Sequence, residues 1–219
     1  MKDEIEQLIP LIKTGKIPAS QIQQITNRIR ESIREDSSKG KELGELLSRV
    51  KKAAIAKDLH TEINWVKIGN GFLAIGHKPG KKISFQGLKN EGTSAVLTLL
   101  NENEGAAAIG RQLQTVDIEW IHFPFSASKP HAGEAVEKVY RLYTQLSNLV
   151  FAGYKIYIHC SAGIHRTGMI TYGFLRFIGM RRTEAFELLQ TLREVTASQV
   201  GDQRLVWADQ FGDQQYDAK

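Results

Sequence analysis

The sequence predicts an α/β protein with a central, mostly parallel sheet flanked by helices and preceded by an N-terminal helical segment. Over residues 1–58, apolar side chains recur at the three- and four-residue spacing of amphipathic helices. From about residue 61 onward, short apolar runs alternate with helical stretches, an order typical of a parallel sheet covered by helices. We therefore expect two parts, a helical segment over 1–58 and an α/β domain over 59–219.

Three short amphipathic helices account for the N-terminal segment. Their apolar stripes are Ile5, Leu8, Ile9 and Ile12, then Ile22, Ile25, Ile29 and Ile33, then Leu43, Leu46, Leu47, Val50 and Ala54. Helices this short are stable only when tertiary packing buries their stripes. The segment is either a small bundle that packs on the α/β domain or a surface for a protein partner or for self-association.

Apolar runs and turn residues define the elements of the α/β domain. Asn70-Gly71, flanked by Trp65–Ile68 and Phe72–Ile75, predicts a β-hairpin. Further strands are expected at Ala95–Leu100, Ile118–Phe123 and Lys155–His159, and helices at 130–150, 166–179, 183–194 and 203–211.

Composition excludes several classes of protein. The chain has 219 residues, 42% of them hydrophobic and 24% charged, which is ordinary for a soluble globular protein. No apolar stretch is long enough to span a membrane, and the N-terminus lacks the pattern of a secretory signal. The single cysteine rules out an intrachain disulfide, and we expect a reducing, cytoplasmic location.

Neither a metal nor a cofactor is predicted, because the six histidines are scattered without the spacing of metal ligands. The net charge of +5 favours anionic partners. A nucleic-acid partner is not expected, since the basic residues are spread along the chain as solvated faces.

The segment that carries chemistry is Lys155–Gly168, with the sequence KIYIHCSAGIHRTG. A strand ends at His159, a tight turn containing Gly163 follows, and a helix opens near Arg166. Backbone N–H groups in such a turn and at a helix N-terminus form a cradle for an anion. The same surroundings lower the pKa of a thiol, so Cys160 is predicted to be a thiolate that attacks phosphorus.

Two residues after the turn and one before it complete this hypothesis. Arg166 can curl back over the cradle, bind two phosphate oxygens and stabilise charge in the transition state. The Thr167 hydroxyl can donate to the sulfur and improve it as a leaving group. We expect His159 to orient the loop from behind rather than to act as a base.

The stretch HCSAGIHRTG resembles the signature loop of protein tyrosine phosphatases, in which a His-Cys pair is followed by five residues, Arg, and Ser or Thr. The resemblance implies that Cys160 is the nucleophile and that Arg166 binds phosphate. It implies further that the backbone amides of Ser161, Ala162, Gly163, Ile164, His165 and Arg166 form the cradle. This chain has His165 where the tyrosine-specific branch usually has glycine.

The resemblance extends over about residues 62–211, and the compact layout is similar to the dual-specificity branch. It implies that 59–219 is a cysteine-dependent phosphatase domain. The run Gln199-Val-Gly-Asp-Gln203 is similar to the loop that positions the hydrolytic water in this family. Gln203, with Gln199 beside it, is therefore expected to hold the water that attacks the phosphocysteine.

The chain departs from the family at the general acid. Aligning Phe123-Pro-Phe and Pro130 with the family pattern places Ala127 where an aspartate is expected. Either the leaving group needs no proton, as with aryl or anhydride phosphates, or another residue donates it. The candidates are His165, Glu102, Glu104, His122 and His131. An introduced substitution at Ala127, or phosphate binding with poor turnover, would also explain the absence.

Taken together, these features predict a metal-independent phosphatase that hydrolyses phosphomonoesters through a phosphocysteine intermediate. Its expected partner is a phosphorylated protein, with phosphotyrosine first and dual specificity allowed, or a small phosphomonoester. Two alternatives stay open: a phosphatase of a non-protein substrate (a nucleotide, an inositol phosphate or an RNA end), and a weakly active, phosphate-binding pseudophosphatase.

Overall fold

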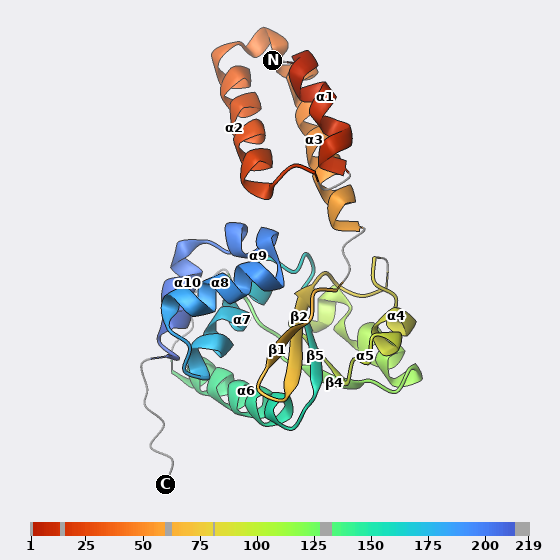
Figure 1. The fold of residues 1–219 in the computed structure, drawn as a ribbon, viewed down its shortest axis with the longest axis vertical. Coiled ribbons are helices and arrows are strands. Elements are labelled where there is room, and N and C mark those ends of the chain that lie inside the picture. Colours follow the sequence, from red (N-terminus) through yellow and green to blue (C-terminus); the bar gives the residue numbers. More distant parts are fainter. Residues whose placement is uncertain (1, 14–15, 60–62, 81, 128–132, 213–219) are drawn as a thin grey trace. The chain divides into compact units, whose positions relative to one another are not determined.

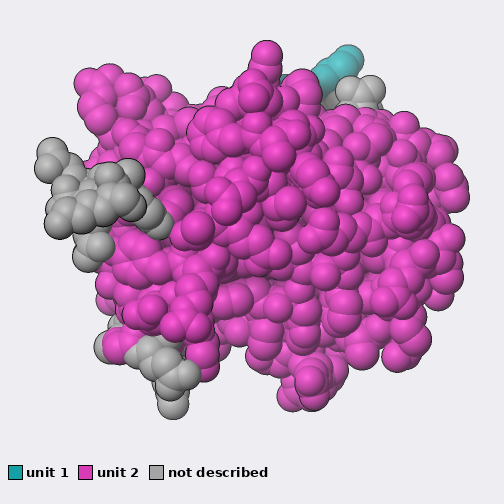
Figure 2. Space-filling model, turned by 90° about the horizontal axis from the view of Figure 1, so that it is seen from below, with its two compact units in different colours: residues 1–62 teal, residues 63–219 magenta. Residues whose placement is uncertain are grey.

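The computed structural model describes residues 2–13, 16–59, 63–80, 82–127 and 133–212. The chain forms two compact units, residues 1–62 and 63–219. Figure 1 shows their elements as a ribbon, and Figure 2 distinguishes the two units on the molecular surface.

Unit 1 holds the three predicted helices, α1 (Lys2–Lys13), α2 (Ala19–Glu35) and α3 (Gly40–Leu59). A 3-10 turn over Ser37–Lys39 separates α2 from α3. The predicted stripes pack on each other, with Ile5, Ile12, Ile25, Ile29, Leu46 and Val50 buried in one cluster. This unit therefore has an apolar core of its own.

Unit 2 contains a sheet of five strands. These are β1 (Val66–Ile68), β2 (Gly71–Gly76), β3 (Ala95–Thr98), β4 (Glu119–His122) and β5 (Lys155–His159). They lie in the order β1-β2-β5-β3-β4. Only the β1–β2 hairpin is antiparallel, and the other neighbours are parallel. The predicted fold class is confirmed.

Helices cover both faces of the sheet: α6 to α10 lie on one side and α4 and α5 on the other (Figure 1). Their bounds are α4 (Phe85–Asn90), α5 (Ala106–Thr115), α6 (Glu134–Phe151), α7 (His165–Phe177), α8 (Arg182–Leu192), α9 (Glu194–Gln199) and α10 (Asp202–Asp209). A short 3-10 helix, η2, spans Glu102–Glu104.

Several predicted bounds differ from the observed ones by a few residues, and two of these differences have a physical reason. The expected helix over 183–194 ends at Leu192, because Arg193 adopts an extended conformation with φ −167° and ψ 105°. The expected strand Ala95–Leu100 ends at Thr98. The Leu99 N–H still donates to the His159 carbonyl at 3.0 Å, and the Leu99 carbonyl accepts from Arg166 Nη1 at 3.3 Å and from the Phe125 N–H at 3.4 Å. Both departures occur next to the loop that follows β5.

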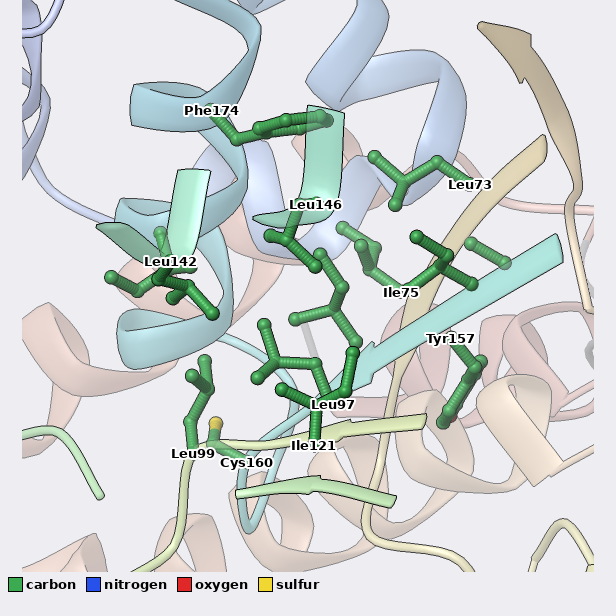
Figure 3. Close-up of a cluster of buried hydrophobic side chains, with 14 of the residues drawn as sticks. Leu73, Ile75, Leu97, Leu99, Ile121, Leu142, Leu146, Tyr157, Cys160 and Phe174 are labelled. Carbon is green, nitrogen blue, oxygen red and sulfur yellow. The ribbon is translucent and has the colours of Figure 1, made fainter. Parts of the chain in front are cut away.

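Cys160 belongs to the edge of the apolar core of unit 2. Leu97, Ile121, Leu146 and Phe174 pack between the sheet and the helices, and Cys160 lies beside Leu99 at the margin of this cluster (Figure 3). In the parallel pair β3 and β5, Thr98 is in register with His159, so both strands end at the same edge of the sheet. The segments that follow these strands are thereby brought together.

Hydrogen bonds and an ion pair also connect α7 to α10 within unit 2. The Asp209 carboxylate accepts hydrogen bonds from the Tyr172 hydroxyl at 2.9 Å and from Arg176 Nε at 3.0 Å. Arg176 is 7% exposed, so this ion pair is shielded from solvent. None of the described helices is both long and apolar enough to cross a membrane.

Candidate active site

The loop after β5 can be built only around a glycine. Gly163 has φ +68°, and a Cβ placed there would lie 2.1 Å from the carbonyl oxygen of Gly76. Helix α7 then starts after Ile164, whose side chain makes no capping hydrogen bond. The first N–H groups of α7 are thus left for another acceptor.

Side chains on α9 and at its N-terminus hold the loop carbonyls away from its centre. Arg193 Nη1 donates to the carbonyls of Ala162 at 3.1 Å and Gly163 at 2.8 Å. The Thr196 hydroxyl donates to the Gly163 carbonyl at 2.7 Å. Because these carbonyls are satisfied from outside, the opposite N–H groups of the loop are free to face inward.

The inward N–H groups act on Cys160, which is 4% exposed. Burial alone would raise the pKa of the Cys160 thiol, since it disfavours the charged form. The Thr167 hydroxyl and the backbone N–H groups of Thr167, Ile164 and Gly163 outweigh burial by stabilising the thiolate, and the net effect is a lowered pKa. The sulfur therefore sits in an anion-stabilising site.

The hydroxyl of Thr167 is available to the Cys160 sulfur. Its Oγ1 is fully buried and lacks a conventional hydrogen-bond partner among the described residues. Within the described ranges it acts on the Cys160 sulfur, whose charged form it favours. Sulfur is a large, diffuse acceptor, so we assign this contact as a weak hydrogen bond to the thiolate.

His159 belongs to a buried chain of hydrogen bonds behind the loop. Trp120 Nε1 donates to Thr98 Oγ1 at 3.0 Å, the Thr98 hydroxyl lies 2.9 Å from His159 Nε2, and His159 Nδ1 lies 3.0 Å from the Cys160 carbonyl. Burial is the main cause that lowers the pKa of His159 to about 4, so the ring is neutral near pH 7. A neutral ring satisfies both contacts with its proton on Nδ1, and Nε2 accepts from Thr98.

Arg166 forms a two-bond ion pair with Glu104 of η2. Nη1 lies 2.6 Å from Glu104 Oε2, and Nη2 lies 2.7 Å from Oε1. Nη1 also donates to the Leu99 carbonyl at 3.3 Å. Among the described residues, these contacts occupy three of the five N–H bonds of the guanidinium and leave the Nε–H and one Nη2–H, which share one edge of the planar group. That edge has the geometry to bind two phosphate oxygens. The Cys160 sulfur also accepts a hydrogen bond from the guanidinium.

Glu104 is itself fixed and ionised. The backbone N–H of Asn101 donates to Oε2 at 2.9 Å, and the Asn101 side-chain amide does so at 3.2 Å. Its hydrogen bonds with Arg166 are the main cause that lowers the pKa of Glu104 to about 2. At neutral pH Glu104 has no proton to give, so it orients Arg166 and is excluded as a general acid.

A pocket of about 350 Å³ opens beside Arg166. Its wall is mostly polar and includes Asn101, Glu104, His165, Arg166 and Arg204. Ala127 also lines this pocket, so the position at which an aspartate was expected is at the site but offers only a methyl group.

The remaining candidates for a general acid are less well placed. Burial, and then the charge of Arg204, lower the pKa of His165, so this pocket residue is neutral above its ordinary titration range. His122 Nε2 lies 2.8 Å from the Leu100 carbonyl, which holds its proton in an internal hydrogen bond. Glu102 does not line the described pocket, and His131 lies outside the described residues.

The two glutamines predicted to hold water are exposed. Gln199 ends α9 and Gln203 lies in the first turn of α10. Neither is among the described residues that line the pocket. Their role in positioning water stays a prediction. No group of three metal-ligating side chains gathers within the described ranges.

Comparisons with known proteins agree with this architecture. No protein-family profile and no curated protein sequence matches the chain. The crystal structure of Tk-PTP in the active form is similar, with a TM-score of 0.51 and 19% identity over 67% of this chain and 93% of that one.

Two further solved structures are similar. Kinase associated phosphatase, crystallised with its catalytic-site cysteine replaced by serine, has a TM-score of 0.55 and 15% identity over 70% of this chain and 97% of its own. PTPMT1 in complex with PI(5)P has a TM-score of 0.54 and 14% identity over 68% and 94%. At such identities the likeness establishes the fold, which is that of protein-tyrosine-phosphatase-like structures.

Sequence reasoning missed three residues that the structure places at the site. Glu104 was considered only as an acid, although its spacing from Asn101 is that of a helix-capping pair. Arg193 and Arg204 lie far along the chain from Cys160, and no local pattern connects them to it. Only the packing of α9 and α10 against α7 brings them near.

Replacing Thr167 with valine should raise the pKa of the Cys160 thiol, because the hydroxyl that stabilises the thiolate is lost. The rate of alkylation by iodoacetamide, measured across pH, reports this pKa directly, since the chain has one cysteine. The alkylation curve should move to higher pH. Thr171→Val, a buried threonine one turn further along α7, is the matched control and should leave the curve in place. Equal curves for both variants would contradict the role of Thr167.

Replacing Glu104 with glutamine should lower kcat/KM for p-nitrophenyl phosphate by about 10- to 100-fold, the worth of a charge-assisted hydrogen bond. The loss follows because Arg166 keeps its charge but loses the carboxylate that orients it. Steady-state kinetics beside Glu187→Gln, an exposed carboxylate on α8, controls for the change in net charge. An unchanged kcat/KM in Glu104→Gln would show that Arg166 is oriented without it.

Proposed function

We propose that the chain is a cysteine-dependent phosphatase that hydrolyses phosphomonoesters through a phosphocysteine intermediate and without a metal ion. The observation that carries this proposal is the loop around Cys160, in which backbone N–H groups and Thr167 stabilise a thiolate that burial alone would suppress. A structural cysteine has no need of such an arrangement.

The mechanism follows from the positions of these groups. The loop amides and the free edge of Arg166 hold the phosphoryl group, and the Cys160 sulfur forms a bond to phosphorus as the ester oxygen leaves. Arg166 and the amides then stabilise the charge that spreads over the phosphoryl oxygens. A water molecule, which we propose is held near Gln203 and Gln199, breaks the sulfur–phosphorus bond and restores the thiolate.

The absence of a carboxylic acid at position 127 affects which leaving groups the site can expel. A phenolic leaving group, with a pKa of about 10, departs more readily without a proton than an aliphatic alcohol does. Aryl phosphates, phosphotyrosine among them, are therefore the first candidates, and dual specificity for alkyl phosphates is less favoured. The wall of the pocket is polar and cationic, and it is not shaped only for an aromatic ring. A small non-protein phosphate is therefore the second candidate substrate.

The proposal is tested by hydrolysis of p-nitrophenyl phosphate in the presence of EDTA, with the wild type beside Cys160→Ser. We expect turnover that persists in EDTA and falls to the level of buffer in the serine variant. Turnover that EDTA abolishes, or that Cys160→Ser retains, would contradict the phosphocysteine route. Binding of phosphate analogues without turnover by the wild type would instead identify a pseudophosphatase.

Introducing an acid at position 127 should restore turnover of poor leaving groups. Ala127→Asp should raise kcat/KM for glycerol 2-phosphate by at least about tenfold, since general acid catalysis contributes roughly 100- to 10,000-fold where geometry is good. The gain for p-nitrophenyl phosphate should be much smaller. Ala127→Asn, of equal size but unable to donate an acidic proton, is the control. An equal gain in both variants, or none in Ala127→Asp, would show that the lack of an acid at this position does not limit turnover.

A further inference from the structure

Arg204 is a second cationic group in the pocket, and among the described residues its charge has no carboxylate partner. It lies in the first turn of α10 and lines the same pocket as Arg166 and His165. Nε donates to the Ala127 carbonyl at 3.1 Å, and Nη1 donates to the Val200 carbonyl at 2.9 Å. Both acceptors are neutral, and no carboxylate within the described ranges forms an ion pair with Arg204.

These contacts fix the guanidinium and leave part of it unused. Nη2 makes no hydrogen bond to any described residue, so its N–H bonds are available to a ligand. Helix α10 is tied to α7 through Asp209, Tyr172 and Arg176, which keeps Arg204 in place. The positive charge of Arg204 lowers the pKa of His165, so this charge acts within the pocket. A fixed cation that has no carboxylate partner among the described residues, next to an anion cradle, can bind a second anion.

The pocket also lacks an acid for the leaving group within the described part of the chain. Glu104 is ionised and bound to Arg166, and Ala127 carries no acidic group. A substrate suited to this site has a leaving group that departs as an anion and carries negative charge toward Arg204. A phosphate meets both requirements, because the second pKa of a phosphate monoester is about 6, whereas that of tyrosine is about 10.

We propose that this site hydrolyses the terminal phosphoanhydride of small diphosphates, with Arg166 and the loop amides holding the phosphoryl group that is transferred and Arg204 holding the phosphate that leaves. This inference rests on the proposed phosphocysteine chemistry and assigns its substrate class. A pocket of about 350 Å³ is in the size range of small-molecule sites.

Water is the only reactant that this hydrolysis requires besides the diphosphate. The Cys160 thiolate forms a bond to the terminal phosphorus while the bond from phosphorus to the bridging oxygen breaks, and that oxygen keeps the electron pair. The remaining phosphate monoester leaves as an anion paired with Arg204. Water then bonds to phosphorus, the sulfur–phosphorus bond breaks with its electrons returning to sulfur, and inorganic phosphate and a proton are released.

The test is phosphate release in EDTA from ADP, AMP and fructose 1,6-bisphosphate, with p-nitrophenyl phosphate as the reference substrate. ADP ends in an anhydride with a second phosphate, AMP has one ester phosphate, and fructose 1,6-bisphosphate has two ester phosphates. For the wild type we expect kcat/KM for ADP to exceed that for either ester by at least about 100-fold, the size of a general-acid contribution that the esters lack.

Variants at Arg204 assign this preference to its charge. In Arg204→Met the ratio of kcat/KM for ADP to that for p-nitrophenyl phosphate should fall by about 10- to 100-fold, and Arg204→Lys should recover most of it. Using a ratio cancels any effect that the variants exert on the loop through the Ala127 carbonyl. Arg111→Met, an exposed arginine of α5 that does not line the pocket, controls for net charge.

Each outcome separates this inference from the function on which it rests. Equal rates for ADP and AMP, or an unchanged ratio in Arg204→Met, would overturn it while hydrolysis of p-nitrophenyl phosphate upheld the phosphocysteine route. Fructose 1,6-bisphosphate performing as well as ADP would also overturn it, because a second anion without an anhydride would suffice. Failure of the wild type on every substrate would instead contradict the proposed function itself.

Discussion

A negative charge on a buried sulfur is the state that the rest of the site supports. Burial opposes that charge, but N–H groups of the loop and of α7, together with the Thr167 hydroxyl, stabilise it and lower the pKa of the Cys160 thiol. Directing them inward requires that the loop carbonyls find donors elsewhere, which Arg193 and Thr196 supply. The extended conformation of Arg193, which separates α8 from α9, is therefore tied to the chemistry of a residue 33 positions earlier.

The parallel sheet supplies the second constraint. Because β3 and β5 end in register, the segment after β3 faces the loop after β5. Glu104 lies in that segment and holds Arg166 through two hydrogen bonds, while Trp120 and Thr98 stabilise the neutral His159 ring beneath the loop. Charge is thus distributed unevenly across the pocket: within the part of the chain that the structure describes, Arg166 forms an ion pair with a carboxylate and Arg204 forms none. On this asymmetry we base the proposal that Arg166 holds the transferred phosphoryl group and Arg204 the departing anion.

The sequence was sufficient for the features that depend on neighbours along the chain. Apolar periodicity predicted the three helices of unit 1, and apolar runs predicted all five strands, because burial on a helix stripe or a sheet face repeats locally. The run Lys155–Gly168 revealed the strand, turn and helix that surround Cys160 for the same reason. The helices α4, α5 and α9 were not predicted, and the partners of Arg166 and of the loop carbonyls depend on tertiary contacts between residues about 30 to 60 positions apart. No local pattern encodes such contacts.

The central claim is that phosphorus becomes bonded to the Cys160 sulfur during turnover. Acid quenching during steady-state hydrolysis of p-nitrophenyl phosphate, followed by peptide mass spectrometry, would detect a phosphoryl group and locate it. We predict that the peptide containing Cys160 carries the phosphoryl group in the wild type, and that the same peptide from Cys160→Ala does not. Turnover with no phosphoryl group on Cys160, or with the group on another residue such as His165, would contradict the mechanism.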